Sequence, residues 1–240
     1  MILKNSDFLQ ALAEHDIYLN EQQENQFERY FELLVETNRL YNLTAITERD
    51  DVYLKHFYDS LTLAIYVRDL SRNDISLVDV GAGAGFPSLP LKILFPNLNV
   101  TMIEALNKRV SFLKNVIREL NLDGVSVIHG RAEDLAHDKN YREKFDYATA
   151  RAVARTSVLA EYTLPFVRLN GKLLVMKGSA ADDELADGKR ALTLLGGRLD
   201  EQFDFELFNN DARVIQVVEK MNETPRKYPR QAGIPSRKPL

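Results

Sequence analysis

Apolar residues divide the chain into a first part with helical periodicity and a second part in which strands and helices alternate. Near the start, large apolar side chains recur at helical spacing, with glutamates on the opposite side, at Phe27, Tyr30, Phe31 and Leu34. Asn20 is a suitable N-cap for this helix, and residues 47–50 predict the start of another helix that runs through His56 towards Val67. The polar run 71–74 predicts a boundary, so residues 1–72 are expected to form a helical extension.

After this boundary the period changes. The predicted strands are residues 75–80, 100–104, 125–128, 145–150 and 172–176. The predicted helices are residues 107–120, 157–167 and 182–195. This alternation favours a parallel sheet covered by helices on both faces. Two further strand-like runs, 202–208 and 213–218, flank a hairpin signal at residues 209–212. The sequence therefore predicts an α/β, Rossmann-like domain over residues 73–222, mostly parallel with a C-terminal antiparallel hairpin, followed by a tail at 223–240.

Composition narrows the class of protein. The chain of 240 residues is 45% hydrophobic and 28% charged, which is typical of a globular protein. It contains no cysteine, which excludes disulfides and cysteine-held metals, and its four histidines lack partners at metal-ligand spacing, so no metal is expected. No apolar run approaches the ~20 residues of a membrane span, and the N-terminus lacks a signal-peptide pattern. We therefore expect a soluble, cytoplasmic protein with no membrane partner, and a monomer because no heptad or broad apolar face is present.

The distribution of charge is uneven, although the net charge is only −4. Acidic side chains predominate in residues 1–50, whereas the last eighteen residues are mainly basic. The basic side chains of this tail are Arg226, Lys227, Arg230, Arg237 and Lys238. A local basic patch favours phosphate binding, and a solvated, frayed tail is the alternative.

A glycine-rich loop follows the first predicted strand, in the run Asp79-Val80-Gly81-Ala82-Gly83-Ala84-Gly85-Phe86-Pro87. Alternate glycines allow the backbone to approach a ligand closely. Gly85 comes one residue too early for the dinucleotide fingerprint, and no Lys-Ser/Thr pair follows as in a P-loop. Tight packing of the strand against the next helix is the alternative explanation.

Polar residues at neighbouring strand ends favour a ligand site. Asp79 precedes the glycines, Glu104 ends the second strand, residues 132–134 follow the third and Arg151 follows the fourth. The carboxyl ends of parallel strands open on one crevice, where a carboxylate can accept hydrogen bonds from a ribose diol. Phe86 and Pro87 crowd the helix N-terminus that a pyrophosphate would need, which disfavours an NAD-dependent dehydrogenase. The residues thus favour a nucleoside cofactor without phosphate over the alternative, solvent-facing charges.

Several motifs recur together along the chain. The loop Leu77-Val78-Asp79-Val80-Gly81-Ala82-Gly83-Ala84-Gly85-Phe86-Pro87-Ser88 is accompanied, in order, by Asn42-Leu43-Thr44-Ala45, His56-Phe57-Tyr58-Asp59-Ser60, Arg151-Ala152-Val153-Ala154, Lys177-Gly178, Tyr228-Pro229-Arg230 and Pro235-Ser236-Arg237-Lys238-Pro239-Leu240. Together they resemble the small-subunit rRNA guanine-N7 methyltransferase family, RsmG (also called GidB), over nearly the whole chain. The loop alone would indicate only a class I S-adenosylmethionine-dependent methyltransferase; its Gly-Phe-Pro extension and the flanking motifs are more specific. Positions 82 and 84 carry alanine, whereas the family has other small residues there, so the departure is slight.

The resemblance implies S-adenosyl-L-methionine as cofactor and 16S rRNA of the small ribosomal subunit as partner. It places Gly81 and Phe86 beside the methionine and adenosine moieties, Glu104, Ala105 and Leu106 around the ribose and adenine, Ala132 and Glu133 at the adenine edge, and Arg151 near the reacting end. Gly83 is added because the centre of the loop must approach the ligand. Lys177 either contacts RNA phosphate or simply ends a strand. With the resemblance, RNA contact by the tail is favoured, with Tyr228 able to stack on a base.

Guanine N7 carries no proton, so its methylation by in-line displacement needs no general base. We therefore expect catalysis by positioning and no dedicated catalytic residue. His56 is interpreted as a packed or capping histidine. Two alternatives remain open: a class I methyltransferase for a small molecule or protein, and a non-catalytic, ribosome-associated cofactor-binding module.

Overall fold

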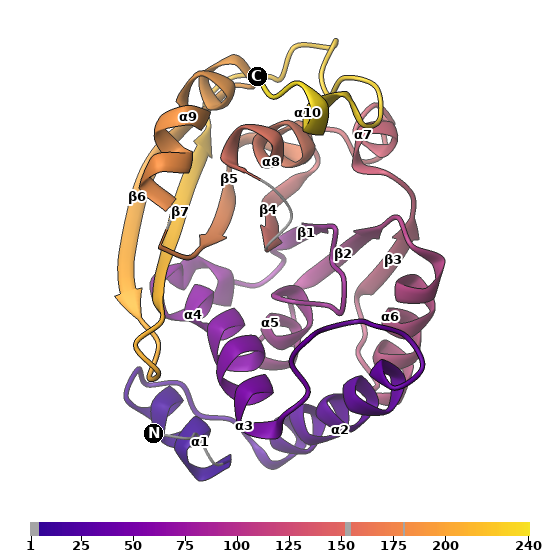
Figure 1. Cartoon of the computed structure of the whole chain (residues 1–240), viewed down its shortest axis with the longest axis vertical. Coiled ribbons are helices and arrows are strands. Elements are labelled where there is room, and N and C mark those ends of the chain that lie inside the picture. Colours follow the sequence, from indigo (N-terminus) through magenta and orange to yellow (C-terminus); the bar gives the residue numbers. More distant parts are fainter. Residues whose placement is uncertain (1–4, 152–154, 180) are drawn as a thin grey trace.

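Seven strands form one sheet in the order β3-β2-β1-β4-β5-β7-β6 in the computed structural model, which describes residues 5–151, 155–179 and 181–240 (Figure 1). The strands are β1 (Ser76–Val80), β2 (Asn99–Glu104), β3 (Val125–His129), β4 (Phe145–Arg151), β5 (Val167–Lys177), β6 (Gly197–Glu206) and β7 (Ala212–Lys220). Strands β1 to β5 pair in parallel, and β7 is antiparallel to both β5 and β6. The predicted mostly parallel sheet with a C-terminal antiparallel hairpin is confirmed.

The helices before β1 are α1 (Asn5–Ala13), α2 (Glu21–Asn38), α3 (Arg49–Val52), the π-helix η1 (Tyr53–Tyr58), α4 (Asp59–Tyr66) and the 3₁₀ turn η2 (Arg68–Ser71). Asn20 caps α2 as predicted: its side chain accepts from the Gln23 N–H at 3.0 Å, and the Gln23 side chain accepts from the Asn20 N–H at 2.9 Å. The predicted run from residue 47 to Val67 is helical, but its middle turns are a π-helix, which apolar spacing did not predict.

The remaining helices are α5 (Ser88–Leu94), α6 (Asn107–Glu119), α7 (Ala132–Leu135), α8 (Thr156–Thr163), the 3₁₀ turn η3 (Leu164–Phe166), α9 (Ala181–Leu194) and α10 (Ile234–Arg237). The helix predicted at 157–167 ends early, because Pro165 lies in η3 and Val167 already begins β5. No helix within the described ranges is long and apolar enough to cross a membrane.

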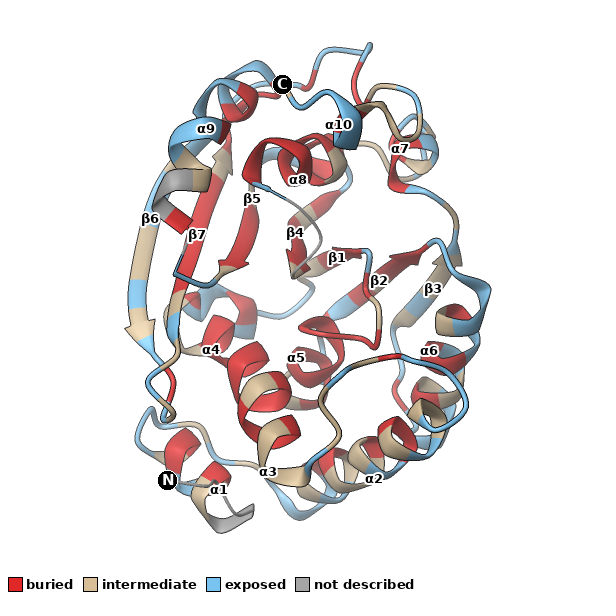
Figure 2. Ribbon diagram, viewed as in Figure 1, coloured by how far each residue is buried: buried red, intermediate tan, exposed pale blue. Residues whose placement is uncertain are grey.

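Two hydrophobic clusters cover the two faces of the sheet. Alternation along the strands sends Leu77 and Met102 to one face, against α1, α2 and α4 to α6. It sends Val78 and Ile103 to the other face, against α7, α8 and α9. The helices before β1 therefore share a cluster with helices of the sheet domain, and Figure 2 shows the central strands buried between the two layers.

The segment after β7 folds back over α7 and α8 (Figure 1). Lys220, fully buried at the end of β7, donates from Nζ to the Leu164 carbonyl and the Thr224 hydroxyl, both at 2.6 Å. Tyr228 is 6% exposed and belongs to the second cluster. The suggestion that Tyr228 stacks on a base is therefore wrong, because its ring is enclosed by the core, and the frayed-tail alternative is wrong for the same reason.

Candidate active site

The glycine loop lies at the switch point of the sheet, where the chain order reverses between β1 and its neighbours β2 and β4. Just after β1, the N–H of Gly81 donates to the Ile103 carbonyl at 2.8 Å, so the loop turns across the end of β2. Gly83 has φ +60°, and a Cβ there would make an ordinary contact of 3.9 Å with the Gly81 carbonyl oxygen. Gly85 has φ +95°, and a Cβ there would meet Leu89 at 2.5 Å and the Tyr30 hydroxyl at 2.7 Å. Packing against α5 and α2 accounts for glycine at position 85, whereas position 83 leaves room for a ligand to approach the backbone.

A cavity of about 490 Å³ opens beside this loop. It is lined by eight of the predicted cofactor residues: Gly81, Gly83, Phe86, Glu104, Ala105, Ala132, Glu133 and Arg151. The ninth, Leu106, does not line the cavity; its side chain is 55% exposed just before α6. The strand ends predicted to share one crevice therefore do meet, and the cavity has the size of a small-molecule site.

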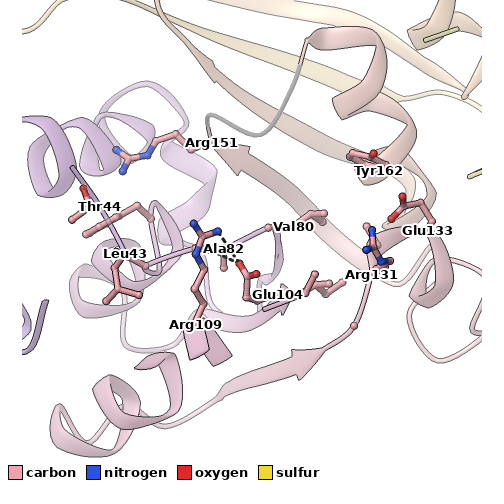
Figure 3. A pocket seen from close by; sticks show the side chains of 18 of the residues that line it. Leu43, Thr44, Val80, Ala82, Glu104, Arg109, Arg131, Glu133, Arg151 and Tyr162 are labelled. Carbon is pink, nitrogen blue, oxygen red and sulfur yellow. Dashed lines mark hydrogen bonds and ion pairs between the residues drawn. The ribbon is translucent and has the colours of Figure 1, made fainter. Parts of the chain in front are cut away.

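Glu104 lies across the middle of the cavity (Figure 3). The carboxylate of this 3% exposed residue accepts from the N–H of Gly83 at 3.0 Å and from the N–H of Leu106 at 2.8 Å. Arg109 is 3.8 Å away and supplies a counter-charge. These contacts fix the carboxylate at the end of β2.

At one end of the cavity, Glu133 and Tyr162 are held by the tail. The N–H of Gly233 donates to Glu133 Oε1 at 3.0 Å, and the hydroxyls of Tyr162 and Ser236 lie 2.8 Å apart. Figure 3 shows Glu133 and Tyr162 together, on the far side of Glu104 from Leu43 and Thr44. The tail is thus part of the framework of this end.

At the other end, Phe86 is covered by two side chains. The imidazole of His56 stacks on its ring, with centroids 4.5 Å apart, and the Arg151 guanidinium lies 5.0 Å from the same ring. Burial, together with the charge of Arg151, lowers the pKa of His56 to about 3. His56 is packed, as interpreted from the sequence, and it also lines the cavity as a neutral ring.

Asp59 connects this end to a second, neighbouring cavity. Its carboxylate, 7% exposed, contacts Arg151 at 3.0 Å and Arg213 of β7 at 2.9 Å. The second cavity, of about 580 Å³, shares His56 and Arg151 with the first. Its basic lining side chains are Lys55, Arg151, Lys177 and Arg213, and Lys177 also pairs with Glu184 at 2.6 Å. We call this second cavity, whose lining also includes the acidic Asp59 and Glu184, the basic groove; it adjoins the end of the first cavity that holds His56 and Arg151.

The basic side chains of the tail do not gather at either cavity. Arg230 is bound inside the fold, where its N–H and guanidinium meet the fully buried carboxylate of Glu161 at 2.7 and 2.6 Å. Arg237 donates to the Gly233 carbonyl at 3.1 Å. The exposed cations of the tail are Arg226, Lys227, Arg237 and Lys238.

Asp79 lies beneath the loop rather than in the cavity. Its Oδ2 accepts from the Ser88 hydroxyl at 2.5 Å, and its buried Oδ1 has no hydrogen-bond partner. Burial raises the pKa of Asp79 to about 7, with the Ser88 hydrogen bond opposing that rise. We infer that Asp79 supports the glycine loop from below through its hydrogen bond with Ser88.

Sequence reasoning missed several lining residues, chiefly Leu43, Thr44, Arg109, Arg131 and Tyr162. The motif Asn42-Leu43-Thr44-Ala45 was a signal for two of them. Ala152, Val153 and Ala154 of the Arg151 motif lie outside the described residues. Across the described part of the chain, no group of three His, Cys, Asp or Glu side chains is arranged to hold a metal.

Comparison with known proteins agrees with this architecture. Residues 23–206 match the family model GidB, rRNA small subunit methyltransferase G. The Leuconostoc mesenteroides protein named "Ribosomal RNA small subunit methyltransferase G" is 62% identical over 99% of this chain and 100% of its own length. The protein of that name from Lactococcus lactis is 54% identical over 98% of both chains.

Solved structures show the same fold at low identity. The YcgJ protein of Bacillus subtilis covers 68% of this chain and 99% of its own, with a TM-score of 0.51 and 15% identity. A Pyrococcus horikoshii protein, provisionally described as a transferase, covers 68% of this chain and 64% of its own, with a TM-score of 0.53 and 17% identity. With a class I methyltransferase fold and a match over nearly its full length, the chain belongs to the rRNA small subunit methyltransferase G (GidB) family and is a methyltransferase.

Proposed function

We propose that the chain transfers a methyl group from S-adenosyl-L-methionine to N7 of a guanine in 16S rRNA, acting in the cytoplasm as a monomer. The observation that carries this proposal is the fixed Glu104 carboxylate midway along a cavity at the switch point of the sheet. The names of the relatives, which specify ribosomal RNA of the small subunit, support the substrate class.

The chemistry of the cavity fits this cofactor. Glu104 would accept hydrogen bonds from the ribose hydroxyls, Ala132 and Glu133 would meet the adenine edge, and Gly81 and Gly83 would border the methionine end. The lining of the first cavity stops at Phe86, before α5, so the N-terminus of the helix that follows the glycine loop does not face the ligand. That suits a cofactor without phosphate. S-adenosylmethionine supplies a methyl group made electrophilic by the positively charged sulfur.

No general base is needed, and the neighbouring side chains agree with that. His56 is the obvious candidate, but a pKa of about 3 makes it a poor proton acceptor, and both of its ring nitrogens have partners. The chain's contribution is therefore to hold the target guanine and the cofactor in line. Such positioning can lower the activation barrier by up to ~7–11 kcal/mol in well-oriented reactions.

For RNA binding, we propose that the basic groove receives the phosphate backbone near the target nucleotide, with Lys177 and Arg213 contacting phosphates. The exposed tail cations Arg226, Lys227, Arg237 and Lys238 would contact the backbone farther away. A plot of log affinity for subunits against log salt should then slope downwards. A flat plot would reject phosphate contact by these side chains.

The test is methyl transfer from labelled S-adenosylmethionine to small ribosomal subunits and to naked rRNA from cells that lack the protein. We expect one cleavage site on chemical mapping of 7-methylguanosine. Cofactor binding without transfer to either RNA would reject the rRNA function and return the small-molecule and protein acceptors, or the non-catalytic module, to consideration.

The variant Glu104→Gln tests the cofactor site. It keeps the shape but loses the charge that strengthens hydrogen bonds to hydroxyl groups, so we expect S-adenosylmethionine to bind roughly tenfold more weakly in calorimetry. Glu119→Gln, at an exposed position of α6, is the control and should bind the cofactor normally. Equal affinities for both variants would remove Glu104 from the site.

A further inference from the structure

The protonation of His56 is determined by its neighbours. Arg151 can only donate hydrogen bonds, and its Nη2 lies 2.9 Å from His56 Nδ1, so Nδ1 must be the acceptor. The Lys55 carbonyl, 3.1 Å from the same nitrogen, already accepts from Arg151 Nη1 at 3.0 Å. The ring is therefore the tautomer with its hydrogen on Nε2, and that hydrogen points to Thr44 Oγ1 at 2.9 Å.

The hydroxyl of Thr44 consequently has both of its acceptor positions occupied. Its Oγ1 accepts from His56 Nε2–H and also from the Ile46 N–H at 3.0 Å. A hydroxyl has two acceptor positions and one hydrogen. The hydrogen of Thr44 is therefore left to be donated, and Thr44 lines the cavity.

The position of this donor is fixed before any substrate arrives. The side chain of Asn38 accepts from the N–H of Leu43 at 2.7 Å and from the N–H of Thr44 at 3.0 Å, which holds the loop backbone. His56 is held in turn by its stacking on Phe86. Figure 3 places Thr44 at the end of the cavity near Arg151, away from Glu133 at the opposite end. A donor fixed in this way needs little reorganisation on binding.

We propose that Thr44 is a specificity residue that donates a hydrogen bond to O6 of the target guanine. The inference rests on the proposed function, because the reacting atom N7 and the acceptor O6 are neighbours on the same edge of guanine. With N7 facing the methyl group, we place O6 beside it, against the part of the wall that carries Thr44.

The same arrangement rejects adenine. Adenine keeps N7 but carries an amino group, a donor, where guanine has O6. Because the lone pairs of Thr44 are occupied by His56 and Ile46, the hydroxyl cannot accept from that amino group. Arg151 fixes the tautomer of His56, and His56 fixes the hydroxyl of Thr44, so this network favours guanine over adenine.

The test uses Thr44→Val, which removes the hydroxyl at similar size, and Thr44→Ser, which retains it. Each enzyme is given small subunits reconstituted with guanine, inosine or 2-aminopurine at the target position; inosine keeps O6 and 2-aminopurine lacks it. We expect Thr44→Val to lose roughly tenfold in kcat/KM on guanine and inosine relative to 2-aminopurine. Thr44→Ser should keep the preference, and calorimetry should show unchanged affinity of Thr44→Val for S-adenosylmethionine.

The outcomes separate this inference from the proposed function. Equal losses on all three bases would make Thr44 a structural residue, and weakened cofactor binding would assign its hydroxyl to the cofactor; either result overturns the inference. Failure of the unmodified enzyme to form 7-methylguanosine in guanine-containing subunits would instead reject the proposed function.

Discussion

His56 and Asp79, two buried side chains on either side of the glycine loop, give the folded protein opposite responses to acid. The pKa of His56 falls from 6.5 to about 3 on burial, so its contribution to stability is present above pH 6.5 and is lost as the pH falls towards 3. The pKa of Asp79 rises from 3.8 to about 7, so its contribution is present below pH 3.8 and is lost as the pH rises towards 7. Between about pH 4 and 6.5 the two slopes oppose each other.

Single variants should show separately how His56 and Asp79 each make the free energy of unfolding depend on pH. We expect urea unfolding of Asp79→Asn to show a free energy of unfolding that falls on acidification from pH 6.5 to 4, by as much as ~1.4 kcal/mol per pH unit. For His56→Gln it should rise over the same range, and the unmodified protein should change least. Parallel curves for all three proteins would contradict this balance.

We expect Gly85 to matter mainly for the stability of the fold and Gly83 mainly for cofactor binding. Gly85→Ala places a methyl group 2.5 Å from Leu89 at φ +95°, so we expect a loss of at least about 2 kcal/mol in the free energy of unfolding. In Gly83→Ala the methyl group would make only an ordinary contact, 3.9 Å from the Gly81 carbonyl oxygen, but φ +60° strains alanine, so we expect a loss of about 1 kcal/mol. Its methyl group would narrow the cavity, so cofactor affinity is the property it should lower most. Thermal unfolding and cofactor titration of both variants check this division.

At the scale of elements, the tail is attached through a buried ion pair. Glu161 of α8 is completely buried, and Arg230 is its partner from 69 residues away. Arg230→Ala leaves that carboxylate uncompensated, so we expect a loss of about 3–5 kcal/mol in the free energy of unfolding, measured with urea. The control Arg226→Ala removes an exposed cation of the same segment and should change stability by less than ~0.5 kcal/mol. If both variants lost the same amount, the pair with Glu161 would not be the cause.

Most elements could be predicted from the sequence because their signals are local. Strands such as residues 100–104 and the helix 107–120 carry their period in consecutive residues. Gly81 and Glu104 could be predicted as site residues because Gly81 directly follows a predicted strand and Glu104 ends one. The strand order and the engagement of Arg230 depend on contacts between distant segments, which no periodicity records. Thr44 and Tyr162 were not predicted as site residues for the same reason, because they reach the cavity from outside the strand ends.

For the whole molecule, the helices before β1 and the sheet are expected to unfold together. Leu77 and Met102 face a cluster that those helices complete, and a chain of residues 73–240 alone would expose it. We expect that fragment to lack a cooperative thermal transition, whereas the full chain should show one in circular dichroism. A sharp transition in the fragment would show that residues 1–72 are energetically separate.

Because Gly233 contacts Glu133 and Ser236 contacts Tyr162, the cavity can be completed only late in the synthesis of the chain. Translation proceeds from the N-terminus, so the whole sheet has been synthesised before these two partners appear. The cavity is thus finished late, and a product of interrupted translation would contain the glycine loop and Glu104 without a completed wall. We therefore expect methyl transfer to require translation beyond residue 236.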